Sequence, residues 1–275
     1  MLADKYSAVW VSHSSIGDFL KCPRAYFLSN VYKDPKSGHK IMLMQPPLAL
    51  GQAIHGTIDS ISILSVEDRF KESLLFKFDR AWKKVSGDFG GFKNSDEENG
   101  YKQRGIEMIK RVINNPGPIL RKAVKIKEEL PYYYLSEKEN IILCGKIDWL
   151  EYLPDDDSLH IIDFKTGRND EKENSLQLPI YHLLVKNCQN RNVKKASYWY
   201  LDRDNKPIEV PLPDLDNAYN RVFSIALKIK QARADKNFVC SRNGCYACKP
   251  LEAVIRGEGR FVGESDYRQD VYVLD

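Results

Sequence analysis

Apolar positions in the first part of the chain recur every three to four residues, the spacing of a helix with one buried face. Helices are predicted after the capping residues 12–15, over 48–64, over 66–84 and over 101–113. We expect Pro23 to interrupt the first helix, because proline lacks an amide donor and clashes with the preceding turn. The stretch 86–99 is rich in Gly, Asp and Asn, which predicts a loop.

The pattern then changes to runs rich in Ile, Val, Tyr and Leu, which predict strands. These runs are 123–135, 141–153, 159–165 and 196–201, with a shorter candidate at 206–212. Helices are predicted between and after them, over 175–186 and 214–235. This order indicates an α/β core with an N-terminal helical elaboration. We expect one domain over 1–275, with a helical part at about 12–120 and a core at about 121–235.

The 275 residues are enough to bury a large core, and the 43% hydrophobic and 29% charged content is ordinary for a globular protein. No apolar run approaches the ~20 residues that a membrane span needs. The first residues lack the basic-then-apolar order of a secretory signal. We therefore expect a cytoplasmic protein without a membrane partner. Six cysteines in such a protein favour ligands or core thiols over disulfides.

The formal net charge is only +4, which does not by itself predict nucleic-acid binding. Basic residues do cluster locally, over 121–127 and 228–233. Two interpretations stay open for these clusters: a contact surface for phosphates, or an ordinary solvated face.

One hairpin, 144–167, carries the candidate chemistry. Pro154–Asp157 suits a turn, and a turn of four residues would pair 153 with 158. The same register places Asp148 opposite Asp163, with their Cβ atoms roughly 4.5–5.5 Å apart. Two like charges at that separation are destabilising unless a positive charge lies between them. Carboxylate oxygens are preferred ligands of Mg²⁺ and Mn²⁺, so the pattern predicts a divalent cation.

Asp163 and Lys165 are two residues apart and therefore project from the same face of the strand. A carboxylate and an ammonium on a buried strand are costly unless they have a function. The carboxylate suits a metal that polarises a phosphate, and the lysine suits charge stabilisation or the orientation of a water. The alternative is a surface hairpin with a routine Asp–Lys ion pair.

Asp148 together with Asp163-Phe164-Lys165 resembles the signature of the PD-(D/E)XK nucleases, in their RecB-like exonuclease branch. Gly51 to His55 resembles the G-x-x-x-H motif of that branch, and Gln177 to Tyr181 resembles its Q-x-x-x-Y motif. Ser15 to Pro23 resembles its N-terminal S-x-x-x-F-x-x-C-P segment. The resemblance covers roughly 12–250. It implies a restriction-endonuclease-like core, in which helices flank a central mixed sheet.

The resemblance also implies a ligand set for Mg²⁺ or Mn²⁺: His55, Asp148, Asp163 and the backbone carbonyl of Phe164. Glu129, or else Glu128, is a candidate for one more carboxylate ligand. A water aligned by Lys165 would attack the phosphodiester in line and leave a 5′-phosphate and a 3′-hydroxyl. Gln177 and Tyr181 are four residues apart, so they share a helix face and would contact the DNA backbone or the lysine.

Three cysteines, Cys240, Cys245 and Cys248, lie within nine positions near the end of the chain. In the iron–sulfur members of the family, AddB and the CRISPR-associated adaptation nuclease among them, one N-terminal and three C-terminal cysteines hold a cluster. That similarity implies Cys22 as the fourth ligand, a [4Fe–4S] cluster and a clasp of 240–248 onto Cys22. The trio departs from the family's usual spacing, and a structural Zn²⁺ is the alternative. Cys144 and Cys188 are expected to be plain buried thiols.

The function expected is a metal-dependent deoxyribonuclease, an exonuclease on single-stranded DNA or DNA ends. Its expected partners are DNA and a helicase or CRISPR integrase. One alternative is a non-cleaving DNA-end-binding or adaptor subunit of a repair, phage or CRISPR-adaptation complex. Another is a different metal-dependent hydrolase built on the same hairpin. No element is predicted for 252–275.

Overall fold

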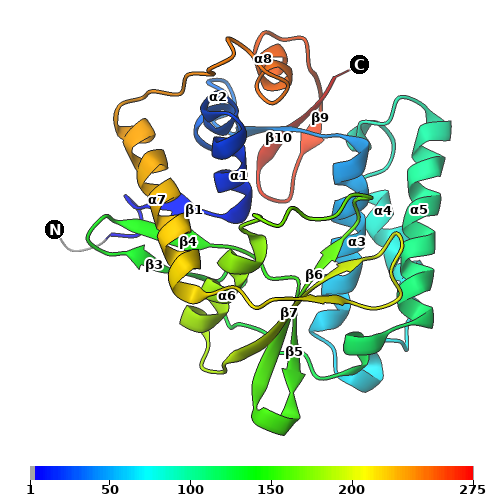
Figure 1. The fold of residues 1–275 in the computed structure, drawn as a ribbon. Helices are drawn as coiled ribbons and strands as arrows, with labels where there is room; N and C mark the ends of the chain where they lie inside the picture. Colours follow the sequence, from blue (N-terminus) through cyan, green and yellow to red (C-terminus); the bar gives the residue numbers. More distant parts are fainter. Residues whose placement is uncertain (1–3, 275) are drawn as a thin grey trace.

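The computed structural model describes residues 4–274; the predicted domain limits at residues 1 and 275 lie outside this range (Figure 1). Its helices are α1 (His13–Lys21), α2 (Pro23–Tyr26), α3 (Pro46–Ser62), α4 (Leu74–Lys83), α5 (Ser95–Asn114), α6 (Gln177–Cys188), α7 (Leu215–Ala234) and α8 (Lys249–Ile255). Its strands are β1 (Val9–Val11), β2 (Lys40–Leu43), β3 (Tyr132–Ser136), β4 (Ile141–Cys144), β5 (Trp149–Leu153), β6 (Ser158–Lys165), β7 (Val193–Tyr200), β8 (Ile208–Val210), β9 (Arg260–Glu264) and β10 (Gln269–Val273).

The central sheet has the strand order β5-β6-β7-β8. Its β6–β7 pair is parallel and the other two pairs are antiparallel, so the sheet is mixed. The α3–α5 group packs on one face, and α6 and α7 pack on the other (Figure 1). The expected α/β class, with helices on both sides of a mixed sheet, is confirmed.

The alternation of side chains along β6 separates two cores. Ile162 and Phe164 point into the core shared with α3, α4 and α5. Leu159 and Ile161 point into the core shared with α6 and α7. Asp163 is the next residue of this second row, near the carboxyl end of β6. The first turn of α6 lies beside it.

Two smaller sheets flank this centre, β1-β4-β3 and β2-β10-β9. No element was predicted for 252–275, but the structure has most of α8 and the strands β9 and β10 within this stretch. In the second small sheet, β10 pairs in parallel with β2 and antiparallel with β9. The C-terminal strand thereby joins the N-terminal part of the chain, a contact that hydrophobic periodicity does not reveal.

Two predicted strands are wrong in extent. The segment 123–131 has one isolated bridge, Ala123 to Glu151, and a ladder begins only at Tyr132. The predicted strand 141–153 is two strands in different sheets, because the chain leaves β4 at Gly145 and enters β5 at Trp149. A Cβ on Gly145 would lie 3.1 Å from Leu184 of α6, so the crossing runs close against that helix.

Two helical predictions also need correction. The expected helix 66–84 is a short 3₁₀ turn followed by α4, which begins only at Leu74. Between them, the buried Arg69 donates to the carbonyls of Ile119 and Arg121, which anchors the break. The predicted loop 86–99 ends early, because α5 starts at Ser95 with Asn94 as its N-cap. The acidic residues that follow Asn94 favour a helix start there.

The helices of the described chain, residues 4–274, include none with the length and apolar character that a membrane crossing requires.

Candidate active site and cysteine cluster

The β5–β6 hairpin has the register expected from the sequence, with Leu153 opposite Ser158 and Trp149 opposite Ile162. The turn consists of a 3₁₀ segment, Pro154–Asp156, and Asp157 in the left-handed conformation. Asp148 lies one residue before β5 and continues this register toward Asp163. Its Oδ2 accepts a hydrogen bond of 3.0 Å from the backbone N–H of Phe164, which joins the two strands at this end.

His55 reaches the hairpin from α3. Its Nδ1 lies 3.4 Å from Asp148 Oδ2, and its side chain is 39% exposed while that of Asp148 is 14% exposed. Burial would lower the pKa of His55, but the Asp148 carboxylate raises it above its ordinary value. Burial would raise the pKa of Asp148, but His55 and the Phe164 N–H hold it below its ordinary value. The imidazole and the carboxylate therefore stabilise each other's charged forms.

Asp163 and Lys165 sit at the end of β6, beside the first turn of α6. Lys165 Nζ lies 3.0 Å from Asp163 Oδ2 and also donates to Gln177 Oε1. Gln177 Nε2 in turn donates to Asp163 Oδ1 at 2.6 Å. The amide of Gln177 thus joins the carboxylate to the ammonium. Pro179 lies in the first turn of α6, where the missing amide donor costs little, as expected.

Tyr181 lies one turn further along α6, and its hydroxyl accepts a hydrogen bond of 3.3 Å from Gln177 Nε2. It is 6% exposed, and its pKa is raised by burial together with the Asp148 and Asp163 carboxylates. The Q-x-x-x-Y pair is therefore part of the same network as the hairpin carboxylates.

Glu171 belongs to this site and His13 is close enough to feel its charges, and neither was identified from the sequence. Glu171 Oε2 lies 2.8 Å from Lys165 Nζ. Burial would lower the pKa of Lys165, but Asp163 and Glu171 raise it above its ordinary value. The pKa of His13 is lowered by burial and by the nearby charge of Lys165. Glu171 lies in a polar stretch typical of a loop, so the sequence pattern around it did not mark it as a site residue.

The surroundings of Asp163 disfavour the ionised form of its carboxylate. It is 1% exposed, and burial and the Asp148 carboxylate raise its pKa to about 7. Its Oδ2 is buried, and among the described residues its charged neighbour is the Lys165 ammonium at 3.0 Å. A buried carboxylate whose charge interacts with a second carboxylate and an imidazole offers the donor types that a hard divalent cation prefers.

A pocket of about 320 Å³ opens beside Asp148, between α3 and the segment 123–131. Lys125, Lys127 and Lys146 line it. Asp59 of α3 holds two of them, with contacts of 3.0 Å to Lys125 and 2.7 Å to Lys146. Part of the basic cluster 121–127 therefore borders the site.

Glu128 and Glu129 line the same pocket and are exposed. Within residues 4–274, no hydrogen bond or ion pair joins Glu129 to the hairpin carboxylates or to His55. The structure thus leaves Glu129 at the rim, apart from the side chains that surround Asp163.

Ser197, His160 and Glu151 form a second polar cluster, on the other face of the sheet. Their hydrogen bonds run in the order of a catalytic triad: a hydroxyl, an imidazole and a carboxylate. His160 is 2.8 Å from Glu151 through Nδ1 and 2.7 Å from the Ser197 hydroxyl through Nε2. Glu151 and Ser197 are each 1% exposed and His160 is 7% exposed. No substrate reaches this serine, so the group is a satisfied core network.

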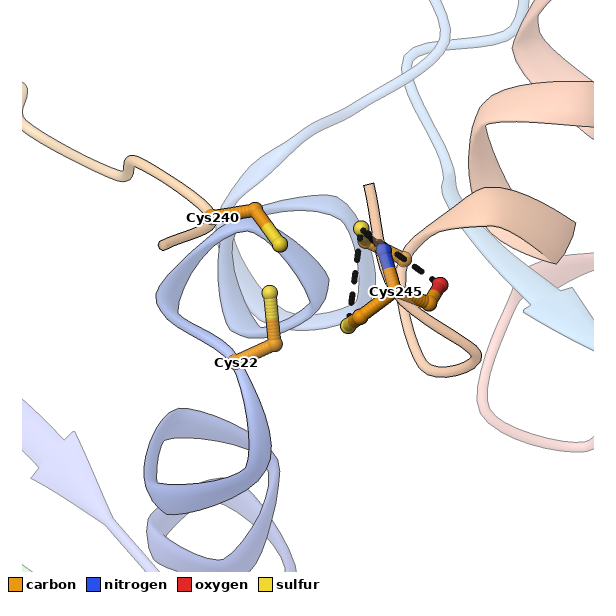
Figure 2. Close-up of side chains that lie close together, drawn as sticks. Cys22, Cys240 and Cys245 are labelled. Carbon is orange, nitrogen blue, oxygen red and sulfur yellow. Dashed lines mark hydrogen bonds between the residues drawn. The ribbon is translucent and has the colours of Figure 1, made fainter. Parts of the chain in front are cut away.

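The four cysteines of the predicted cluster lie together, with one sulfur from each within 4.8 Å of all the others. The cluster joins Cys22, between α1 and α2, to the loop before α8, which carries Cys240, Cys245 and Cys248. The labelled Cys22, Cys240 and Cys245 point into one common space (Figure 2). The structure brings 240–248 next to Cys22, as the predicted clasp requires, and the four cysteines could bind a metal.

Backbone N–H groups point at these sulfurs. Cys248 Sγ accepts from the N–H of Cys245 at 3.2 Å. The N–H groups of Cys248 and Ala247 lower the pKa of Cys245 to about 7. Such N–H···S contacts stabilise thiolates, which are the form that binds metals. Cys144 is buried as expected, whereas Cys188 is only partly buried.

Comparison with known proteins agrees with this architecture. A search of curated proteins finds no significant match. A family model described as the PD-(D/E)XK nuclease superfamily matches residues 10–249, a range that includes the hairpin, α3, α6 and the four cysteines. The mixed sheet with flanking helices is consistent with the restriction-endonuclease-like fold of that superfamily. The chain therefore belongs to the PD-(D/E)XK nuclease superfamily.

Proposed function

We propose that this protein is a deoxyribonuclease of the RecB-like branch that uses Mg²⁺ or Mn²⁺ and acts as an exonuclease on single strands or DNA ends. Membership of the superfamily implies a metal-dependent nuclease. The observation that carries the proposal is the network around Asp163, which faces Asp148 and is joined to Lys165 by the Gln177 amide. The match to the G-x-x-x-H and Q-x-x-x-Y motifs supports the RecB-like branch.

The residues that would hold the cation are His55, Asp148, Asp163 and the carbonyl of Phe164. When bound, a divalent cation supplies Lewis-acid polarisation of the scissile phosphate and offsets the repulsion between the two carboxylates. A bound cation would stabilise the ionised form of Asp163 in particular, because burial and Asp148 raise the pKa of that carboxylate.

Lys165 would stabilise the negative charge that develops on the phosphate and orient the attacking water. Its raised pKa keeps the ammonium charged, so it acts as a cation and hydrogen-bond donor and not as a general base. Glu171 and Gln177 hold it in place. Tyr181, which touches Gln177, would position that amide and contact the DNA backbone.

The pocket beside Asp148 would admit the strand that is cut. Its lysines suit phosphates, because each Lys neutralises one backbone charge and releases counterions. Lys127 is exposed, and Asp59 holds Lys125 and Lys146 at the opening. Glu129 at the rim is proposed as an additional carboxylate that joins the ligand set when substrate and cation are bound.

The test is cleavage of end-labelled single-stranded and linear duplex DNA with and without Mg²⁺ or Mn²⁺. We expect metal-dependent degradation, faster on single strands, and products with a 5′-phosphate. A ladder that shortens from one end would indicate exonuclease action and its polarity. Tight DNA binding without cleavage in either metal would instead favour the non-cleaving end-binding or adaptor subunit.

The cysteine cluster is proposed as a structural metal site, and its sulfur spacing supports one of the two candidates, a Zn²⁺ ion and a [4Fe–4S] cluster. Four sulfurs bonded to one tetrahedral zinc at about 2.3 Å lie about 3.8 Å apart. The four sulfurs here lie within 4.8 Å of one another, and Cys245 and Cys248 are 3.7 Å apart. A [4Fe–4S] cluster places four irons between the thiolates and needs wider spacing. We therefore favour one Zn²⁺ over the iron–sulfur cluster.

Metal analysis and absorption spectroscopy of protein purified without oxygen decide between them. We expect about one zinc per chain and a colourless protein, since Zn²⁺ has a filled d shell. A brown protein with absorbance in the visible range, four irons per chain and bleaching by dithionite would establish the [4Fe–4S] cluster instead.

A further inference from the structure

A second pocket lies where the end of α7 meets α2 and the turn that follows it, at the opposite end of the molecule from the β5–β6 turn (Figure 1). It has a volume of about 610 Å³. Three of its lining side chains are cations, Arg24, Arg233 and Lys236, and two are aromatic, Phe27 and Phe238. The remaining lining residues are two valines and Asn237, so none of the described residues that line it is a carboxylate.

The positive charges of this pocket are poorly compensated. Arg24 pairs with Glu252 at 3.0 Å. Arg233 and Lys236 are exposed and take part in none of the ion pairs found within residues 4–274. The neighbouring Lys40 is half-buried, and its pKa is lowered by burial and by the charges of Arg233 and Lys33. Like charges crowded in this way favour an anionic ligand.

The aromatic side chains form one wall. The rings of Phe27 and Phe238 lie 4.9 Å apart at 31°, and both are partly exposed. Arg24 lies over the Phe27 ring at 5.6 Å. Planar rings next to cations match the two parts of a nucleotide, because a base stacks on an aromatic face while the phosphate pairs with a cation.

Lys236 occupies an unfavourable backbone position. It follows the end of α7 with a φ of 52°, in the left-handed region where glycine is preferred. The N–H of the next residue, Asn237, closes the helix end on Ala232 O at 3.0 Å. Glycine would satisfy this backbone at lower cost, so helix termination alone does not account for a lysine at this position.

The cysteine cluster holds both walls of the pocket. Arg24 follows Cys22 by two residues, and Phe238 precedes Cys240 by two residues. Because these two cysteines belong to one cluster, a metal bound by both would fix the separation of the walls.

We propose that this pocket, with the cations Arg24, Arg233 and Lys236 beside Phe27 and Phe238, binds a segment of single-stranded nucleic acid away from the active site. This inference rests on the proposed function, because the segment would belong to the strand being cut. Single strands fit better than duplex, since only unpaired bases offer a free face for stacking.

The test measures binding without added divalent cation, so that binding is separated from cleavage. Fluorescence anisotropy of a labelled oligothymidine is recorded against salt for wild type, for Arg233→Gln/Lys236→Gln, and for the control Lys186→Gln/Lys228→Gln. The control removes two exposed lysines that do not line the pocket. We expect weaker binding by the first double variant alone, with a salt slope smaller by about 1.4, which is ~0.7 for each lost cation.

The variant Lys236→Gly distinguishes a loss of nucleic-acid binding from a loss of stability. It is expected to raise the thermal midpoint, because glycine relieves the left-handed backbone, and still to weaken oligothymidine binding. Equal binding by wild type, Lys236→Gly and both double variants would overturn the proposal. Displacement of the label by polyglutamate but not by unlabelled oligothymidine would also overturn it, in favour of an acidic protein ligand.

A small chromogenic phosphodiester, too short to reach the pocket, distinguishes this inference from the proposed function. We expect the pocket variants to hydrolyse it with Mg²⁺ or Mn²⁺ as fast as wild type. If the wild type cleaves neither substrate, the nuclease proposal fails while the anisotropy result still decides on the pocket.

Discussion

Asp163→Asn is expected to lower the rate of DNA cleavage by about a thousandfold or more, while the protein stays folded. The substitution keeps the size of the side chain and its contact with Gln177 but removes the charge that would hold the cation. Removal of one preorganised electrostatic contact in an active site costs about 10²–10³ in rate, and loss of a metal ligand costs at least as much. The measurement is initial-rate cleavage of end-labelled single-stranded DNA at saturating Mg²⁺ or Mn²⁺.

The same substitution is expected to leave stability unchanged or to raise it. Burial and Asp148 raise the pKa of Asp163 to about 7, above the ~3.9 of an unfolded chain. The stability that this group contributes is present at low pH and is lost as the pH rises through about 7. Asparagine has no such charge, so without divalent cation the variant should melt at or above the wild-type temperature at pH above about 7.

Asp155→Asn is the matched control, since Asp155 is an exposed carboxylate at the turn of the same hairpin. It should cleave and melt like wild type. Cleavage by Asp163→Asn at the wild-type rate would refute the assignment of the active site. A variant that fails to fold would contradict the electrostatic account of Asp163.

Cys248→Ser is expected to lower the melting temperature by on the order of 10 °C and to abolish the metal binding proposed for the cysteine cluster. Cys248 is fully buried, and the site connects Cys22 to the loop before α8. A structural metal site of four cysteines contributes folding free energy directly, and a few kcal/mol in a chain of this size corresponds to roughly ten degrees. Thermal unfolding and metal content of the purified protein measure both effects.

Cys188→Ser is the control for this change, because Cys188 is a partly buried thiol outside the cluster. It should keep the metal and melt close to wild type. Limited proteolysis of Cys248→Ser should cut first near the loop before α8, since the metal no longer holds that loop. A Cys248→Ser protein with full metal content and an unchanged melting temperature would show that the four sulfurs do not hold a structural metal.

The local parts of the candidate site followed from the sequence alone. The hairpin register needs only the turn length and the alternation of a strand, so the opposition of Asp148 and Asp163 was predictable. The spacing of Asp163 and Lys165 on one strand face, and of Gln177 and Tyr181 on one helix face, follows from the same periodicities. The α/β class followed from the order of helices and strands.

The tertiary structure decided which distant segments meet. Periodicity indicates which face of an element is buried but not which residues cover that face. The ion pair of Lys165 with Glu171 and the pairing of β10 with β2 were therefore not predicted. The run 141–153 looked like one strand, because a chain that passes from one sheet to another keeps the same apolar character in both. The 3.4 Å approach of His55 to Asp148 likewise depends on how α3 packs against the sheet. Contacts across long sequence separations are set by packing of the whole core, and the residues at either end carry no local sign of them.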